Sequence, residues 1–465
     1  MPKNTERDDV KRQDRKDARI RYKYMIQLSD KFNLRKIFKF TIPSVMMMVV
    51  TSIYSVVDGF FVSNFAGKTQ FAAVNFIMPV IMMLSCLGFM FGTGGSAIIA
   101  GCMGEGKDEK ANEVFSQNIA VSLILGFIIA VLGFMGMPFI ARSFGAEGEL
   151  LENSVLYGRM LMCSMPFYIL QYEFQALFPT AEKPHLGLMV TVAAGVTNII
   201  LDALFCAVFG WGLKGAAAAT MISEYIGGGI PLIYFISKNS SKLRIRAFSP
   251  DMKSLLRVIT NGSSELMSNI SMSLVGMLFN IQLLKYAGEN GVAAYGVIMY
   301  VNFIFISIFI GYSVGIAPVF SFKYGAKKVT EIKELLVKSI LIIAATSVVM
   351  FTVGQLLNGF VAEAFVGYDA ELKQITCHGF RVFACAFLFS GFSIFGSAFF
   401  TALGDGLTSA LISFLRTLVF EVAALLILPL ILGIDGIWMS VVVAELISFI
   451  VTGMFVFAKR KKYNY

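Results

Sequence analysis

The chain has 465 residues, of which 57% are hydrophobic and only 15% are charged, and its mean hydropathy is +0.73. Soluble domains are about 45–50% apolar and about 25% charged, so the composition excludes a soluble protein and indicates an integral membrane protein. The net charge of +9 does not indicate a nucleic-acid partner, because most basic residues border apolar segments. Attraction to anionic membrane lipids explains that placement better.

Apolar stretches of 20 or more residues recur along the whole chain. Their length predicts membrane-spanning helices rather than the ten-residue alternating strands of a β-barrel. In chain order we predict twelve spans, at residues 37–62, 71–100, 115–138, 154–178, 186–209, 213–237, 258–285, 291–322, 335–358, 374–402, 406–432 and 434–458.

Lysine and arginine are concentrated at both chain ends, in the first 39 residues and in residues 459–462. Since cytoplasmic loops of membrane proteins carry an excess of these residues, both termini are predicted to be cytoplasmic. An even number of spans agrees with that orientation.

The two halves of the chain resemble each other at a separation of 221 residues. Residues 71–80 (FAAVNFIMPV) align with 292–301 (VAAYGVIMYV), and the shared positions include Gly67 with Gly288 and Gly212 with Gly433. Because each half holds six spans, the repeats have the same orientation and an axis along the membrane normal. We therefore expect an all-α integral membrane protein with twelve transmembrane helices in two parallel six-helix lobes. The expected segments are a basic cytoplasmic tail (1–36), a first lobe (37–237), a cytoplasmic linker (238–257), a second lobe (258–458) and a cytoplasmic tail (459–465).

Polar residues inside the spans are concentrated in the first half. Asp58 lies near the outer end of the first predicted span, where a carboxylate costs roughly 2.5–3.5 kcal/mol to insert and usually has a function. Asp202 in the fifth span and Thr220 in the sixth are expected at the same depth. Tyr54 and Asn198 precede the two aspartates by four residues, and so lie on the same helix faces. The second half has no acid near residues 277–279, and apolar residues stand opposite the other three, namely Val419 (Asn198), Ala423 (Asp202) and Val441 (Thr220).

Two carboxylates with amide, phenol and hydroxyl oxygens nearby can exchange a proton or bind Na⁺. A sodium ion would be held by Asp58, Asn198, Asp202 and Thr220. The alternative is a hydrogen-bonded polar cluster that only holds the helices together.

Four segments carry a resemblance to a known family: IPSVMMM with YSVVDGFFVSNFAG, GTGGSAIIAGCMGEGK, TNIILDALF followed by WGLKGAAAAT, and GYSVGIAPVFSFKYGAKK. In this order and at these spacings, the chain resembles the multidrug and toxic compound extrusion (MATE) transporters, in the bacterial DinF/MepA-like branch. The resemblance covers nearly the whole chain after residue 36.

The resemblance implies that Asp58, Tyr54, Asn198, Asp202 and Thr220 form the site of the coupling cation or proton. It also implies that Pro43 lets the first helix bend as that site titrates. A glutamine that some members have one turn before the tyrosine is Thr51 here. Some members use an acid on the seventh span, for which Glu265 is the candidate. A multi-pass protein of the bacterial cytoplasmic membrane is expected, with no cofactor besides the coupling ion.

Further ionisable residues lie inside the predicted spans. Glu224 follows Thr220 by four residues and can line the same cavity, although its repeat mate Glu445 favours a shared structural role. Arg381 and Arg416 are expected to pair with acids such as Glu421. Glu173 and His378 complete the set, the latter expected at a membrane interface near an extracellular helix end.

No catalytic motif accompanies these residues, and we expect no enzyme. The segment GCMGEGKD (101–108) approaches a phosphate-binding loop, but Asp108 replaces the required Ser or Thr. The predicted function is a secondary antiporter, a monomer, that exports cationic amphiphilic drugs or toxic metabolites in exchange for Na⁺ or H⁺. The alternatives are a lipid-linked precursor flippase of the same superfamily and, from another class, a membrane-embedded enzyme or receptor.

Overall fold

A computed structural model describes residues 26–463 and residue 465 of the chain. The predicted tail at 1–36 therefore lies mostly outside the described residues. Long helices follow one another because, in a membrane, each segment must satisfy its own backbone polar groups. Asn33 starts the first helix by accepting a hydrogen bond from the backbone N–H of Lys36. The helical segments of the first half are α2 (Leu34–Phe61), η1 (Val62–Ala66), α3 (Lys68–Gly104), α4 (Asp108–Ser143), α5 (Gly148–Thr180), α6 (Pro184–Asp202), η2 (Ala203–Val208) and α7 (Gly212–Ile236).

The second half repeats this order. Its segments are α8 (Met252–Gly325), α9 (Val329–Val366), α10 (Ala370–Phe383), η3 (Ala384–Ala386), α11 (Phe387–Ala402), α12 (Gly406–Phe414), η4 (Leu415–Phe420), α13 (Glu421–Leu432) and α14 (Ile434–Tyr463).

Ten helical stretches of the described chain are long and apolar enough to cross a membrane. One of them, α8, holds Gly288 with a φ of 61° and consists of two helices joined end to end. The 33-residue α5 is not among the ten but has the length of a span. With α5 and the break in α8 counted, the described residues form the twelve predicted helices. The predicted all-helical membrane fold is confirmed.

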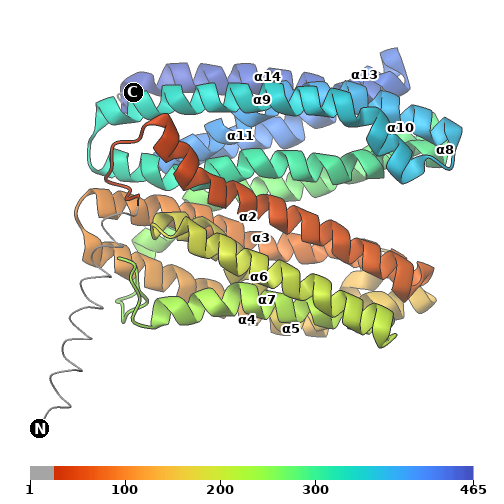
Figure 1. Cartoon of the computed structure of the whole chain (residues 1–465), viewed down its shortest axis with the longest axis horizontal. Coiled ribbons are helices and arrows are strands. Elements are labelled where there is room, and N and C mark those ends of the chain that lie inside the picture. Colours follow the sequence, from red (N-terminus) through yellow and green to blue (C-terminus); the bar gives the residue numbers. More distant parts are fainter. Residues whose placement is uncertain (1–25, 464) are drawn as a thin grey trace, which may run out of the picture.

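The two halves form two lobes, one above the other in Figure 1. The first half lies below, and α9 to α14 lie above. Helix α2 begins beside the upper lobe at the left and ends beside α6 at the right, and it packs against both α8 and α6 (Figure 1). The left-hand end carries residues 26–33 and the C-terminus, and we call it the predicted cytoplasmic end.

The repeat is also visible in the backbone. Gly67 and Gly288, which correspond at 221 residues, have φ values of 106° and 61° and join the first helix of each half to the second. Gly212 and Gly433, at the last connection of each half, have φ values of 53° and 61°. Residues with a side chain rarely adopt this conformation, which explains why both members of each pair are glycine.

The lobes touch most closely towards the predicted cytoplasmic end, where backbone meets backbone. A Cβ atom placed on Gly104 of α3 would lie 2.1 Å from the carbonyl oxygen of Phe322 in α8. Gly325 of α8 corresponds to Gly104 in the repeat and makes the equivalent contact in the other direction. A Cβ atom there would lie 2.2 Å from the carbonyl oxygen of Gly101 in α3. A Cβ on Gly262 would lie 1.9 Å from the carbonyl oxygen of Met90. Small residues allow this close approach, which seals the lobes against each other.

The connection between the lobes is attached to α4. The backbone N–H groups of Arg244 and Arg246 donate to the side chains of Asn112 (2.8 Å) and Ser116 (2.9 Å). The lysine ammonium of Lys110 donates to Asp251, the N-cap of α8, at 2.7 Å and holds the pKa of that carboxyl well below its usual range. The linker thus runs along the first lobe as far as the residue that starts α8.

Candidate functional site

Asp58 and Asp202 lie next to each other in the first lobe. Asp58 is in the last turn of α2, and Asp202 is the last residue of α6 before the π-helical segment η2. Their carboxyl groups are within hydrogen-bonding reach of each other. The Thr220 hydroxyl of α7 lies 3.5 Å from Oδ1 of Asp58 and 3.1 Å from the carbonyl oxygen of Ala216, and its one hydrogen can be donated to either. Three helices therefore bring together three of the five residues predicted from the sequence.

Asp202 is buried without a hydrogen-bond donor. Its exposed fraction is 0%, and no donor among the described residues reaches either carboxylate oxygen. The neighbouring Asp58 is also an acceptor when ionised, and it is partly exposed. Two adjacent ionised carboxylates in an apolar region are strongly unfavourable unless a proton or a cation lies between them. The arrangement is suited to taking up a positive charge that arrives past Asp58.

The other two predicted residues extend this group along α2 and α6. The Tyr54 hydroxyl accepts a hydrogen bond of 3.0 Å from Gln171 of α5. Its ring packs against Gly195, where a Cβ would lie 2.9 Å from the ring. Asn198 is 1% exposed, and its carbonyl oxygen has no donor among the described residues. Asn198 thus offers a free oxygen one turn from Asp202.

A separate cavity of about 500 Å³ lies between the lobes. Methionines of α3 and α8, among them Met82, Met83 and Met299, line it together with four charged residues of the second lobe. The four charged residues are Glu265, Arg416, Glu421 and Glu445. Glu265 therefore belongs to this cavity and not to the group around Asp58 and Asp202.

Comparison with known proteins identifies the family. The family model described as MatE matches residues 43–204 and again residues 266–426, which reproduces the internal repeat. The chain belongs to the MatE family. The multidrug export protein MepA of Staphylococcus saprophyticus is 25% identical over 429 residues, covering 91% of this chain and 93% of that protein.

Two solved structures of MATE transporters have the same fold as this chain over nearly its whole length. A crystal structure of MATE in complex with MaL6 matches with a TM-score of 0.89 and 25% identity, covering 93% of this chain and 98% of that one. The outward-facing conformation of a multidrug resistance MATE family transporter of the MOP superfamily matches with a TM-score of 0.88 and 26% identity, covering 93% and 97%. Membership confirms the predicted resemblance and the prediction of a transporter rather than an enzyme.

In this MatE protein the predicted ion pair between Arg416 and an acid inside the spans is present, but the acid is Glu445 and not Glu421. Arg416 forms a two-pronged ion pair with Glu445 of α14, with Nε–Oε1 and Nη2–Oε1 distances of 2.9 and 2.7 Å. In the repeat, the position of Arg416 corresponds to Gly195 in the first lobe, and Glu445 corresponds to Glu224. Among the described residues no arginine pairs with Glu224, which lies by Ser164 instead. The two glutamates therefore differ in their partners.

Breaking this ion pair is expected to destabilise the protein. Glu445→Gln leaves a largely buried guanidinium without its carboxylate, which we expect to cost about 3 kcal/mol of unfolding free energy. The double variant Arg416→Met with Glu445→Leu fills the space without charge and is expected to regain most of that loss. Unfolding by denaturing detergent in bicelles measures both changes. A double variant less stable than Glu445→Gln would contradict the explanation.

Helix α5 supplies neighbours that sequence reasoning missed. Gln175 donates to the Thr51 hydroxyl at 3.2 Å, and the fully buried Tyr157 lies beside Thr220. Some family members have a glutamine at the position of Thr51. In this chain two glutamines of α5, Gln171 and Gln175, lie beside Tyr54 and Thr51 instead. Their spacing of four residues on one helix face was the available signal.

The remaining candidates lie apart from these groups. Pro43 is buried in α2, which continues as a helix from Leu34 to Phe61, and its role as a hinge stays a prediction. Glu173 is fully buried and accepts a hydrogen bond of 2.7 Å from Asn118 of α4. His378 is half-exposed and lies 2.7 Å from Asp435. Arg381 forms no ion pair among the described residues, so its predicted pairing with an acid is not confirmed, and its backbone carbonyl accepts from Gln355.

Proposed function

We propose that the protein is a secondary multidrug antiporter that exports cationic amphiphilic compounds in exchange for Na⁺ or H⁺. The observation that carries the proposal is the pair Asp58 and Asp202, whose buried member has no donor for either oxygen. The relatives named multidrug export protein support the export of drugs, since they match over nine-tenths of the chain.

The charges of the central cavity support a cationic substrate. Arg416 and Glu445 neutralise each other, whereas Glu265 and Glu421 form no ion pair among the described residues. The cavity therefore has an excess of carboxylates beside flexible methionine side chains, which adapt to hydrophobic surfaces of different shape. A positively charged drug with aromatic rings fits both features.

An ion gradient supplies the energy in this proposal. One cation that enters across 100 mV releases roughly 2.3 kcal/mol, in addition to its concentration gradient. Entry to Asp58 and Asp202 would drive a rocking motion of the lobes about their contact at the predicted cytoplasmic end. The proposal places a monomer in a bacterial cytoplasmic membrane, in contact with lipid, with both termini in the cytoplasm.

Transport by the purified wild type tests the proposal. Ethidium movement in proteoliposomes is expected when an inward Na⁺ or pH gradient is imposed, and only the coupling gradient should support it. An anionic dye of similar size should not move. Failure of well-incorporated protein to transport ethidium or any other cationic drug would contradict the proposal and favour the flippase alternative.

A further inference from the structure

A short segment before the first helix contacts both lobes at the predicted cytoplasmic end. We call residues 27–33 the strap. It has no regular secondary structure, and it runs from the described N-terminal end to Asn33, the N-cap of α2. Although it precedes the helices, Leu28 is 0% exposed and Phe32 is 6% exposed. Burial of these two apolar side chains shows that the strap is packed into the protein.

On the first lobe, the strap is held at the turn between α5 and α6. The backbone N–H of Leu28 donates to a carboxylate oxygen of Glu182 at 2.9 Å. Glu182 has a φ of 60° and lies in the tight turn that precedes α6. The strap therefore has a charge-assisted hydrogen bond to the first lobe.

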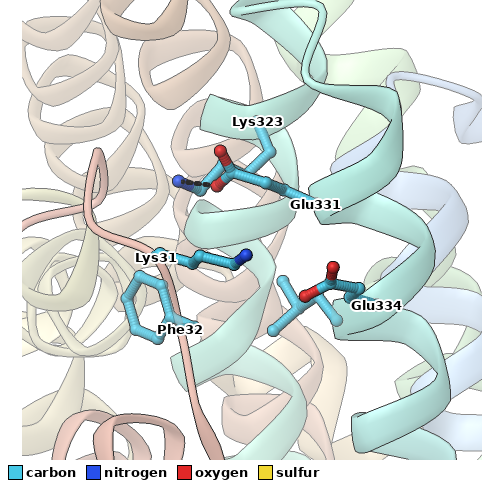
Figure 2. A pocket seen from close by; sticks show the side chains of 6 residues that line it. Lys31, Phe32, Lys323, Glu331 and Glu334 are labelled. Carbon is cyan, nitrogen blue, oxygen red and sulfur yellow. Dashed lines mark ion pairs between the residues drawn. The ribbon is translucent and has the colours of Figure 1, made fainter.

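On the second lobe, two lysines hold the strap by its backbone. The ammonium of Lys323, in the last turn of the second part of α8, donates to the carbonyl oxygens of Ser29 (3.0 Å) and Asp30 (2.7 Å). The ammonium of Lys338 in α9 donates to the carbonyl oxygen of Phe32 at 3.1 Å. Figure 2 shows the Lys31 side chain of the strap extending towards Glu334, with the ion pair of Lys323 and Glu331 above it and the Phe32 ring on the other side.

Lys323 depends on the strap because its side chain is only 2% exposed. Its ammonium has three donor hydrogens, and its acceptors are the two strap carbonyls and the carboxylate of Glu331. Withdrawal of the strap would leave two buried donor hydrogens of a charged group without acceptors, which is costly. The strap and the closed contact between the lobes are thus energetically linked.

We propose that the strap holds the lobes together at the predicted cytoplasmic end and must release at least one lobe before that end can open. It bridges the lobes beside the glycine contacts of α3 and α8, so separation there breaks the hydrogen bonds to Lys323 and Lys338 or the one to Glu182. The strap thereby determines what fraction of the molecules is open at the predicted cytoplasmic end. This rests on the rocking motion of the proposed function.

Distances between the lobes test the strap without any transported drug. Spin labels at the exposed positions Glu109 (α4) and Lys333 (α9), in a background with all cysteines replaced by serine, report the separation in lipid nanodiscs. Lys323→Met removes two hydrogen bonds to the strap, and Lys338→Met removes one from a less buried position. We expect the ratio of separated to closed lobes to rise about tenfold in Lys323→Met and less in Lys338→Met.

Lys328→Met is the matched control. Lys328 also pairs with Glu331, at 3.1 Å, but has no contact with the strap among the described residues. Its distance distribution is expected to equal that of the wild type. Unchanged distances in both Lys323→Met and Lys338→Met, or an equal change in Lys328→Met, would overturn the proposal. If Lys323→Met does not fold, the distances measured in Lys338→Met alone test the proposal.

The strap and the transport function can fail separately. Wild type that transports ethidium while Lys323→Met keeps the wild-type distances would refute the strap alone. Lobes that respond to Lys323→Met in a protein that moves no cationic drug would refute the proposed function and leave the strap intact.

Discussion

Asp202→Asn is expected to reduce gradient-driven ethidium transport in proteoliposomes to the level of protein-free vesicles. Asparagine has the same shape, but it cannot ionise and so cannot take up a proton or balance a bound cation. The variant should fold at least as well as the wild type. An amide can donate to Asp58, and the change removes a buried carboxylate that has no donor among the described residues. Loss of transport with unchanged or raised thermal stability is therefore the expected combination.

Glu173→Gln is the control for removing a buried acid from the same lobe. Glu173 is also 0% exposed, but its carboxylate is held by Asn118 between α4 and α5. We expect wild-type transport from this variant. Transport by Asp202→Asn at the wild-type rate, or an equal loss in Glu173→Gln, would contradict the assignment of the coupling site to Asp58 and Asp202.

The same pair of variants separates the two coupling ions. If Na⁺ binds at Asp58 and Asp202, Na⁺ at about 100 times its dissociation constant raises the unfolding free energy by roughly 2.7 kcal/mol. Asp202→Asn should lose this stabilisation, and Glu173→Gln should keep it. A proton site instead makes the stability of the wild type independent of Na⁺ at constant ionic strength.

The fold was predictable because the length of the apolar segments and the internal repeat can both be read from the sequence. The length of the apolar segments predicts the helices, and the repeat at 221 residues predicts the two lobes. The corresponding glycines Gly67 and Gly288 both have a positive φ at the same connection of their lobes. Helix α5 shows where hydropathy is weaker, because its polar residues bind other helices of the protein. The strap was not predictable, because its contacts are mostly made by backbone carbonyl groups, which every residue has whatever its side chain.

The candidate site was predictable only where helix faces could be compared. Their depth in the spans predicts that Asp58, Asp202 and Thr220 lie together, and the structure brings their side chains together. The sequence predicts an acid as the partner of Arg416 but does not single one out, because three glutamates lie inside the same lobe and only packing selects Glu445. Depth along a helix can be read from a sequence, but the rotation of one helix against another depends on contacts distant in the chain.

Gly104→Ala is expected to weaken the closed contact at the predicted cytoplasmic end and to lower ethidium transport several-fold. The new Cβ would lie 2.1 Å from the carbonyl oxygen of Phe322 and 3.0 Å from the backbone nitrogen of Ala326, so α3 and α8 must move apart. Overpacking of this kind costs about 1–3 kcal/mol, which changes an equilibrium between two states by roughly 5- to 150-fold. The spin labels at Glu109 and Lys333 should report a larger separated population.

Gly101→Ala is the matched control, one turn earlier on the same helix. Its Cβ would have no neighbour nearer than 4.0 Å, the carbonyl oxygen of Ser321. Both changes gain about 0.8–1 kcal/mol of helix propensity, so a difference between them comes from the contact with α8. Equal transport and equal distances in the two variants would show that the lobes do not need this backbone contact. A defect confined to Gly104→Ala makes the seal between α3 and α8 a required part of the cycle, because the same seal must form and separate in each turnover.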